Sequence, residues 1–186
     1  GAQNEFGRWR RAEPGDFVPI NKPVFVSAKS TDLPQDSKVI GVVTKEGPRA
    51  YPLRLMTYHH VVNETVAGKN LSVTYCGMAN TAVVFERPAG TGNLEAGALF
   101  GGSLAMREQG TGNCWAQIAP VTLPEDRQTT ATLVPVVPSV VATWEKWKAV
   151  HPDSKVLSPV AGNELQYEAY DRKQPGFVAN TKMNET

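Results

Sequence analysis

The stretch KNLSVTYCGMANTAVVFERP, residues Lys69–Pro88, contains two runs in which apolar and polar side chains alternate. The first run ends at Cys76, the pattern pauses over Gly77–Asn80, and it resumes at Ala82–Phe85. Alternation with a period of two is typical of a strand with one buried face, and glycine and asparagine favour tight turns. The stretch therefore predicts two strands joined by a turn or bulge, with Cys76 at the break.

The sequence on both sides of this stretch predicts more strands of the same kind. KVIGVVTKEGPRAYPLRL, from Lys38, has two apolar runs around Lys45–Pro48, which is typical of a hairpin. LEAGALFGGSLAMREQGTGNCWAQIAPV, from Leu94, bends at Gly101–Gly102 and turns at Gly110–Asn113, so that Cys114 begins the next strand. Short strands with a turn about every ten residues favour a sheet sandwich or barrel.

Two segments predict helices instead. Within Leu53–Val66 the apolar side chains follow a helical spacing, which predicts a short helix. Thr143 is a suitable N-cap for WEKWKAV, and His151 precedes Pro152, which disfavours a further helical turn.

We therefore expect an α+β fold that is mainly β: a single domain, built as an antiparallel sandwich or partly closed barrel with one or two short helices. The chain has 186 residues, with 16 glycines and 14 prolines that favour short elements. We interpret residues 1–35 as an extended N-terminal arm, 36–162 as the β-rich domain and 163–186 as a C-terminal tail packed on the surface. Tyr167, Tyr170 and Phe177 are spaced as docking anchors for that tail.

Charge and hydropathy narrow the classes of partner. Lys and Arg total 19 and Asp and Glu total 18, so the sequence gives no electrostatic reason to expect nucleic acid or an anionic membrane surface as a partner. No run reaches the roughly 18 apolar residues that a membrane-spanning helix needs. We expect protein partners instead.

Three interpretations of the cysteines remain open at this stage. His59, Cys76 and Met78 form a soft ligand set of the kind that suits copper. Cys76 and Cys114 would be able to form a disulfide if their strands are neighbours. Cys76 could also act as a nucleophile with His59 as its base and Glu64 or Asn63 as the orienting group, although the sequence has none of the common hydrolase or nucleotide-binding motifs. Two buried free thiols are the default against which these are weighed.

Three blocks together resemble the bacterial and archaeal family known as domain of unknown function number 3179. They are the segment from Val39 to Phe85, LFGGSLAMREQGTGNCWAQ, and TWEKWKAVHPDSKVLS, in matching order and spacing. Members of that family are usually exported or membrane-attached, so the resemblance implies a location outside the cytoplasm, in the periplasm or cell envelope. It implies no biochemical activity.

This chain departs from the family pattern at its polar positions. The family typically has Trp-His-Glu where this chain has Tyr58-His59-His60, and Cys-x-x-Cys where it has Cys76-Gly77-Met78-Ala79. Polar family residues are also replaced at Gly101–Ser103 and Arg107–Glu108. The resemblance therefore implies a degenerate member that lacks the second cysteine.

From these departures we expect a non-catalytic accessory or structural domain of the cell envelope, with no cofactor. It would dock on a larger, membrane-bound assembly through its arm and tail. The alternative is a metal-binding or thiol-redox protein that uses Cys76 with His59, with or without Met78 and Cys114.

Overall fold

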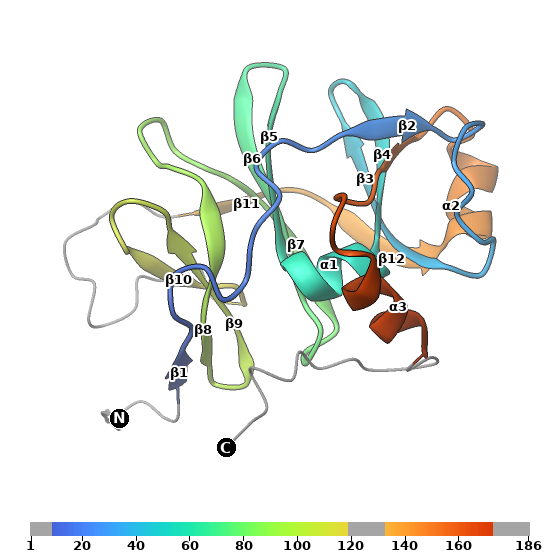
Figure 1. Cartoon of the computed structure of the whole chain (residues 1–186). Coiled ribbons are helices and arrows are strands. Elements are labelled where there is room, and N and C mark those ends of the chain that lie inside the picture. Colours follow the sequence, from blue (N-terminus) through green and yellow to red (C-terminus); the bar gives the residue numbers. More distant parts are fainter. Residues whose placement is uncertain (1–8, 119–132, 173–186) are drawn as a thin grey trace.

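The computed structural model describes residues 9–118 and 133–172, and within these ranges it contains three β-sheets and three helices (Figure 1). The first sheet has the strand order β1-β8-β9-β10, with bounds Trp9–Arg11, Leu94–Phe100, Ser103–Glu108 and Cys114–Ala116. The central sheet has the order β11-β7-β6-β5, with bounds Val134–Val137, Thr81–Glu86, Lys69–Cys76 and Val61–Val66. The third sheet has the order β12-β3-β4-β13-β2, with bounds Ser139–Thr143, Lys38–Thr44, Gly47–Pro52, Lys155–Leu157 and Phe25–Ser27. The helices are α1 (Leu53–His59), α2 (Trp144–Val150) and α3 (Glu164–Arg172).

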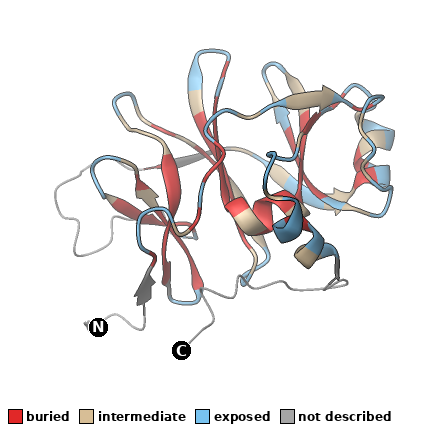
Figure 2. Ribbon diagram, in the orientation of Figure 1, coloured by how far each residue is buried: buried red, intermediate tan, exposed pale blue. Residues whose placement is uncertain are grey.

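The central sheet lies between the other two and is buried on both faces, as the red strands in the middle of Figure 2 show. Because successive side chains of a strand point to opposite faces, β6 contributes to two cores at once. Leu71, Val73 and Tyr75 pack toward the third sheet in a cluster that includes Tyr51. Cys76 packs in the opposite direction, in a cluster that includes residues of the first sheet.

A smaller core lies on the outer face of the third sheet, beneath α2. Trp144 and Trp147 of α2 pack there with Val39 of β3 and Val156 of β13. Gly41 makes this approach close enough, since an added Cβ would lie 2.2 Å from Cε3 of Trp147. The glycine in KVIGVVT therefore allows α2 to pack closely on the sheet.

The fold class predicted from the sequence is confirmed: the chain is mainly β, and the neighbouring strands pair antiparallel except for β13 with β4. None of the sheets in the described ranges closes into a barrel, so the sandwich interpretation holds, in three layers. The predicted hairpin is β3–β4, and the strands on either side of Gly77–Asn80 are β6 and β7. The predicted cap is also present, since Thr143 Oγ1 accepts a hydrogen bond from the Lys146 amide at 3.4 Å.

The predicted helix over Leu53–Val66 is wrong in its second half. The helix α1 ends at His59, His60 takes a φ of 64°, and Val61–Val66 forms β5. The spacing of apolar residues fits both elements, but the β-branched residues of the second half pair with β6 over the whole length of β5. Burial between two sheets overrides the helical spacing.

The described parts of the two ends pack against the rest of the chain. In the N-terminal arm, β1 pairs with β8 and β2 pairs with β13, while Ile20 forms a parallel bridge with Val62. At the other end α3 buries Tyr167 in the core shared with the third sheet. With α3 the described residues contain three helices, one more than we expect from the sequence. Phe177 lies outside the described residues.

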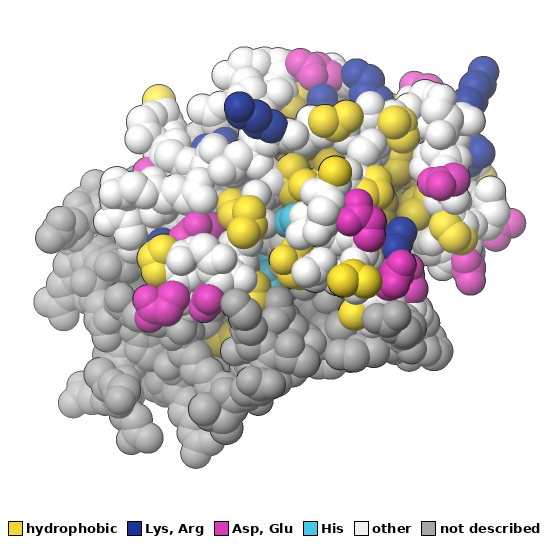
Figure 3. Space-filling view, viewed as in Figure 1, with side chains coloured by type: hydrophobic (Ala, Val, Ile, Leu, Met, Phe, Trp, Pro, Cys, Tyr) yellow, Lys and Arg dark blue, Asp and Glu magenta, His cyan; other side chains and the backbone are white. Residues whose placement is uncertain are grey.

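The surface is mixed in character. On the face drawn in Figure 3, side chains of both charge signs are interspersed with apolar and neutral ones, in keeping with the formal net charge of +1. No helix in the described ranges is both long and apolar enough to cross a membrane.

Candidate functional site

His59 sits at the end of α1 with both ring nitrogens engaged. Its Nδ1 lies 2.7 Å from the carbonyl oxygen of Val18, and its Nε2 lies 2.6 Å from the hydroxyl of Tyr167. Because a carbonyl only accepts, Nδ1 carries the proton and Nε2 accepts from Tyr167. Burial lowers the pKa of His59, which favours this neutral form. A metal at either nitrogen would have to displace one of these bonds.

His60 follows in the strained conformation that ends α1. Its Nδ1 lies 3.3 Å from the carbonyl oxygen of Tyr75, while its Nε2 is buried and has no hydrogen-bond partner among the described residues. Phe17 meets the ring edge to face, with centroids 5.3 Å apart. Burial lowers the pKa of His60 to about 4, so the imidazole is neutral at neutral pH.

The predicted disulfide between Cys76 and Cys114 is not formed in the structure, where both cysteines are buried. The expectation depended on neighbouring strands, but β6 belongs to the central sheet and β10 to the first sheet. The Cys76 thiol instead accepts a contact from the Ala79 amide at 3.4 Å, within its own turn. Cys114 packs in a separate small cluster with three alanines.

The predicted metal ligands face different parts of the molecule. His59 bonds Tyr167, which belongs to the core on one face of the central sheet, whereas Cys76 belongs to the core on the other face. Met78 lies in the turn and is 38% exposed. In residues 9–118 and 133–172, no group of three or more His, Cys, Asp and Glu side chains could hold a metal ion.

Arg107 and Glu108, two further positions at which the chain departs from the family pattern, are used in local structure. Arg107 makes an ion pair with Glu95 at 2.7 Å and donates to the carbonyl oxygen of Ala12 at 2.8 Å. The Glu108 carboxylate accepts from the Gly92 amide at 2.6 Å and from the side chains of Thr111 and Asn113. These bonds lower the pKa of Glu108 against the effect of its partial burial, and they join the loop before β8 to the turn after β9.

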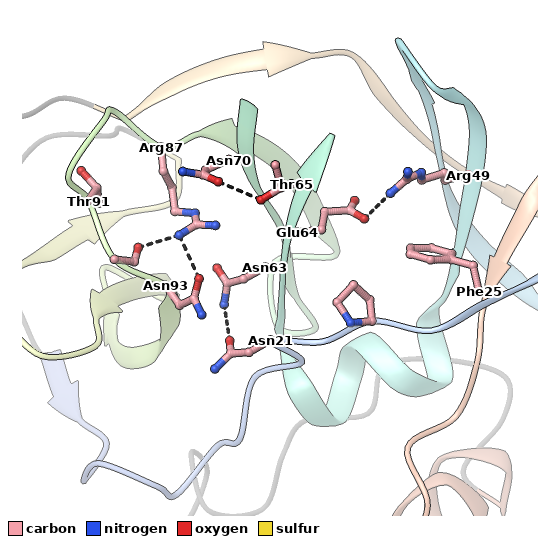
Figure 4. A pocket seen from close by; sticks show the side chains of 12 residues that line it. Asn21, Phe25, Arg49, Asn63, Glu64, Thr65, Asn70, Arg87, Thr91 and Asn93 are labelled. Atoms are coloured by element: carbon pink, nitrogen blue, oxygen red, sulfur yellow. Dashed lines mark hydrogen bonds and ion pairs between the residues drawn. The ribbon is translucent and has the colours of Figure 1, made fainter. Parts of the chain in front are cut away.

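A pocket of about 670 Å³ lies at the edge of the central sheet, where all three sheets meet (Figure 4). We call it the polar pocket; its lining residues are Asn21, Pro23, Phe25, Arg49, Asn63, Glu64, Thr65, Asn70, Arg87, Thr91, Gly92 and Asn93. Its floor is the open part of the edge strand β5. The N-terminal segment covers the first half of that edge, since Ile20 exchanges backbone bonds with Val61 and Asn63.

The third-sheet side of the polar pocket is an ion pair. Arg49 of β4 donates to the Glu64 carboxylate through Nη1 and to Glu46 at 2.9 Å through Nη2. Tyr51 also donates to Glu64, and the Phe25 ring lies 4.8 Å from the Arg49 guanidinium carbon. Burial raises the pKa of Glu64, an effect that the bonds from Tyr51 and Arg49 oppose.

The middle of the polar pocket is organised by Asn63 of β5. Its side chain bonds both backbone groups of Leu94, donating to the carbonyl oxygen at 2.8 Å and accepting from the amide at 3.0 Å. It also donates to the side chain of Asn21 at 2.8 Å and accepts from Ser72 at 2.7 Å. One amide therefore ties the central sheet to the first sheet and to the N-terminal segment.

The first-sheet side of the polar pocket is formed by Arg87, the residue after β7. Both hydrogen bonds that its side chain makes to described residues come from Nη1. They go to the carbonyl oxygen of Gly92 and to Oδ1 of Asn93, each at 2.9 Å. The side chain reaches from this wall toward the middle of the pocket (Figure 4). The amide, hydroxyl and guanidinium groups of the lining can each form hydrogen bonds, so the arrangement suits the binding of a polar ligand.

The sequence interpretation missed this pocket. Asn63 and Glu64 were considered only as groups that orient His59, yet their side chains bond Leu94 and Arg49 instead. A signal was present in VVNETV, where three polar residues interrupt a run of valines in a strand and the first two, Asn63 and Glu64, are buried. Polar side chains at such positions need buried partners, and these partners are the walls of the pocket.

Comparison with known proteins supports the family resemblance. A family model described as "Protein of unknown function (DUF3179)" matches residues 15–183, and the chain therefore belongs to this family. No significant match is found among the curated proteins or among the solved structures.

Proposed function

We propose, from its membership of the DUF3179 family and from its site geometry, that this chain is a non-catalytic accessory domain of the cell envelope. In this proposal it docks on a larger, membrane-bound assembly. The extracytoplasmic location rests on the resemblance to a family whose members are usually exported or membrane-attached.

The observation that carries the proposal is the engagement of His59. The residue matches the recurrent histidine of the family, yet its two nitrogens join three segments of the chain: α1, the N-terminal segment at Val18 and α3 at Tyr167. Cys76 is likewise 3% exposed and packed between sheets. Residues that suggest chemistry by their type are occupied in holding the fold.

The proposed docking surface is at the ends of the chain, as the sequence predicts. Much of the described arm and tail packs on the chain itself, but α3 also presents Leu165 to solvent with 73% of its surface exposed. A large apolar side chain on a terminal helix is available to a protein partner, and burying it would contribute about 1.5 to 3 kcal/mol.

Co-purification from native membranes tests the proposal. Affinity-tagged wild type should retain a membrane-bound complex after mild solubilisation, whereas Leu165→Glu should lose it. Val150→Glu is the matched control, because Val150 is 72% exposed but belongs to α2, which packs on the outer face of the third sheet, whereas α3 packs in the core on the opposite face. A wild-type protein that stays monomeric and without partners at every concentration would overturn the proposal.

A further inference from the structure

Arg87 has an open edge in the polar pocket at Nη2. The residue is only 7% exposed, and its Nε is buried without a partner among the described residues. Both hydrogen bonds that the Arg87 side chain makes to described residues come from Nη1. The side of the guanidinium formed by Nε and Nη2 therefore faces no protein acceptor in the described ranges. Because Nε is buried, Nη2 is the donor on this side that an anion in the pocket can reach, and a charge-assisted bond from it is stronger than a bond between neutral groups.

The charge of Arg87 is also poorly compensated. Its two acceptors are the neutral oxygens of Gly92 and Asn93. Glu108 acts on it electrostatically but directs its own hydrogen bonds to Gly92, Thr111 and Asn113. Because a buried cation without an ion pair is costly, an anion at the open edge would stabilise the folded protein.

Arg49 offers no second anion site. Its guanidinium is shared between Glu64 and Glu46, so the third-sheet side of the pocket is already neutralised. One uncompensated guanidinium matches an anion of a single charge, which is a carboxylate rather than a phosphate monoester carrying about two charges at neutral pH.

The rest of the lining suits hydroxyl groups. Asn70, Asn93 and Thr91 each present donors or acceptors around the space in front of Arg87, and Thr65 donates to Asn70 at 2.9 Å. In β5 the amide of Asn63 bonds Ile20 on the outer edge, and alternation along the strand directs the Thr65 amide to the same edge. Hydroxyl groups both donate and accept, as this mixture of amides and backbone groups requires.

We propose that the polar pocket binds a small hydroxylated monocarboxylic acid, such as a sugar acid. Its carboxylate accepts a hydrogen bond from Nη2 of Arg87, and its hydroxyl groups bond Asn70, Thr65 and neighbouring groups of β5. This binding role is independent of the docking role proposed above.

Isothermal titration calorimetry and thermal unfolding of the full chain test this site with defined probes. D-glucuronate and D-gluconate should bind and raise the melting temperature, because a ligand that binds only the folded state stabilises it. D-glucose tests the need for a carboxylate, and inorganic phosphate tests the alternative oxyanion. Both should bind at least about tenfold more weakly, a difference of roughly 1.4 kcal/mol.

Arg87→Lys keeps the charge but removes the planar guanidinium with its Nη2 donor, and should weaken sugar-acid binding by about tenfold or more. Arg54→Lys is the matched control: Arg54 also has a buried Nε without a described partner, but it pairs with Asp171 and does not line the polar pocket. The affinity of the Arg54→Lys variant for the sugar acids should stay within about twofold of wild type. If Arg87→Lys does not fold, Asn70→Ala carries the test, with an expected loss of about threefold or more.

Four results would overturn the proposal. They are no binding of either sugar acid to the wild type, glucose binding as tight as glucuronate, phosphate binding tighter than both acids, and an equal loss of affinity in Arg54→Lys. A fifth result, unchanged affinity in Asn70→Ala, would also overturn it, because the ligand would then lie away from the described hydroxyl contacts.

Discussion

His60 combines two energetic costs at one position. It has a φ of 64°, which a side chain other than glycine rarely adopts, and a buried Nε2 without a partner among the described residues. The conformation allows the chain to leave α1 and enter β5 within a single residue. The burial of the imidazole disfavours its protonated form, so this cost, unlike the backbone strain, should be visible in the pH dependence of stability.

Acid should destabilise the wild type through His60. The folded-state pKa of His60 is about 4, below the ordinary value of 6.5, so the unfolded chain binds the proton more readily. Stability should be fully present above about pH 6.5 and fall as the pH drops toward 4, by about 3 kcal/mol at roughly 1.4 kcal/mol per pH unit. His60→Asn, which tolerates a positive φ, should remove this contribution. Urea unfolding at several pH values measures it, and parallel curves for both proteins would contradict it.

Cys76 should regain a partner when the family's second cysteine is restored. The Ala79 amide lies 3.4 Å from the Cys76 thiol, so the turn already folds back onto the sulfur. In Ala79→Cys, oxidised glutathione should accept two electrons from the two thiols, giving an intraturn disulfide and two molecules of reduced glutathione. Mass spectrometry should show the loss of two hydrogen atoms. Wild type is the control and should stay reduced, because Cys114 is in another sheet; a reduced variant or an oxidised wild type would count against this.

At the scale of elements, the sequence predicts structure best where local and tertiary preferences agree. The hairpin around Lys45–Pro48 and the capped helix after Thr143 both have turn or cap chemistry that matches their burial. In Leu53–Val66 the local and tertiary preferences disagree, because a single helical spacing of apolar residues covers a helix and then a strand. The change from helix to strand at His60 involves no glycine or proline, so the local sequence contains no signal that predicts it.

The contact between β3 and α2 should depend on Gly41. A Cβ there would overlap the Trp147 ring at 2.2 Å, so Gly41→Ala must push α2 away from the third sheet. We expect a loss of about 1 to 3 kcal/mol in the free energy of unfolding, the usual cost of overpacking. In a Trp147→Leu background the same change should cost clearly less. Urea titration of the four proteins gives this coupling, and an equal cost in both backgrounds would show that the Trp147 contact is not responsible.

At the scale of the whole molecule, the candidate site is harder to predict than the fold. The polar pocket takes Arg49 from the third sheet, Glu64 from the central sheet and Arg87 from the loop that leads to the first. Residues so far apart in sequence share no motif or spacing. His59 and Cys76, whose types attract attention in the sequence, lie in packing positions instead.

The buried pair Arg49–Glu64 should be a principal link between the central and third sheets. Their side chains are 7% and 3% exposed, whereas the other partner of Arg49, Glu46, is 45% exposed. Glu64→Gln leaves a buried guanidinium without its close counter-charge, which should cost about 3 kcal/mol or more in the free energy of unfolding.

Arg49→Met in the same background removes the unpaired charge and should recover much of that loss, since apolar replacement of a whole buried pair is often neutral. Urea unfolding of the two single variants and the double variant measures the coupling. If the double variant is as unstable as the two single losses added together, the pair acts independently and the sheets are held by their apolar cores alone. If it recovers, Arg49 and Glu64 are energetically coupled, and this coupling links β4 to β5 at one wall of the polar pocket.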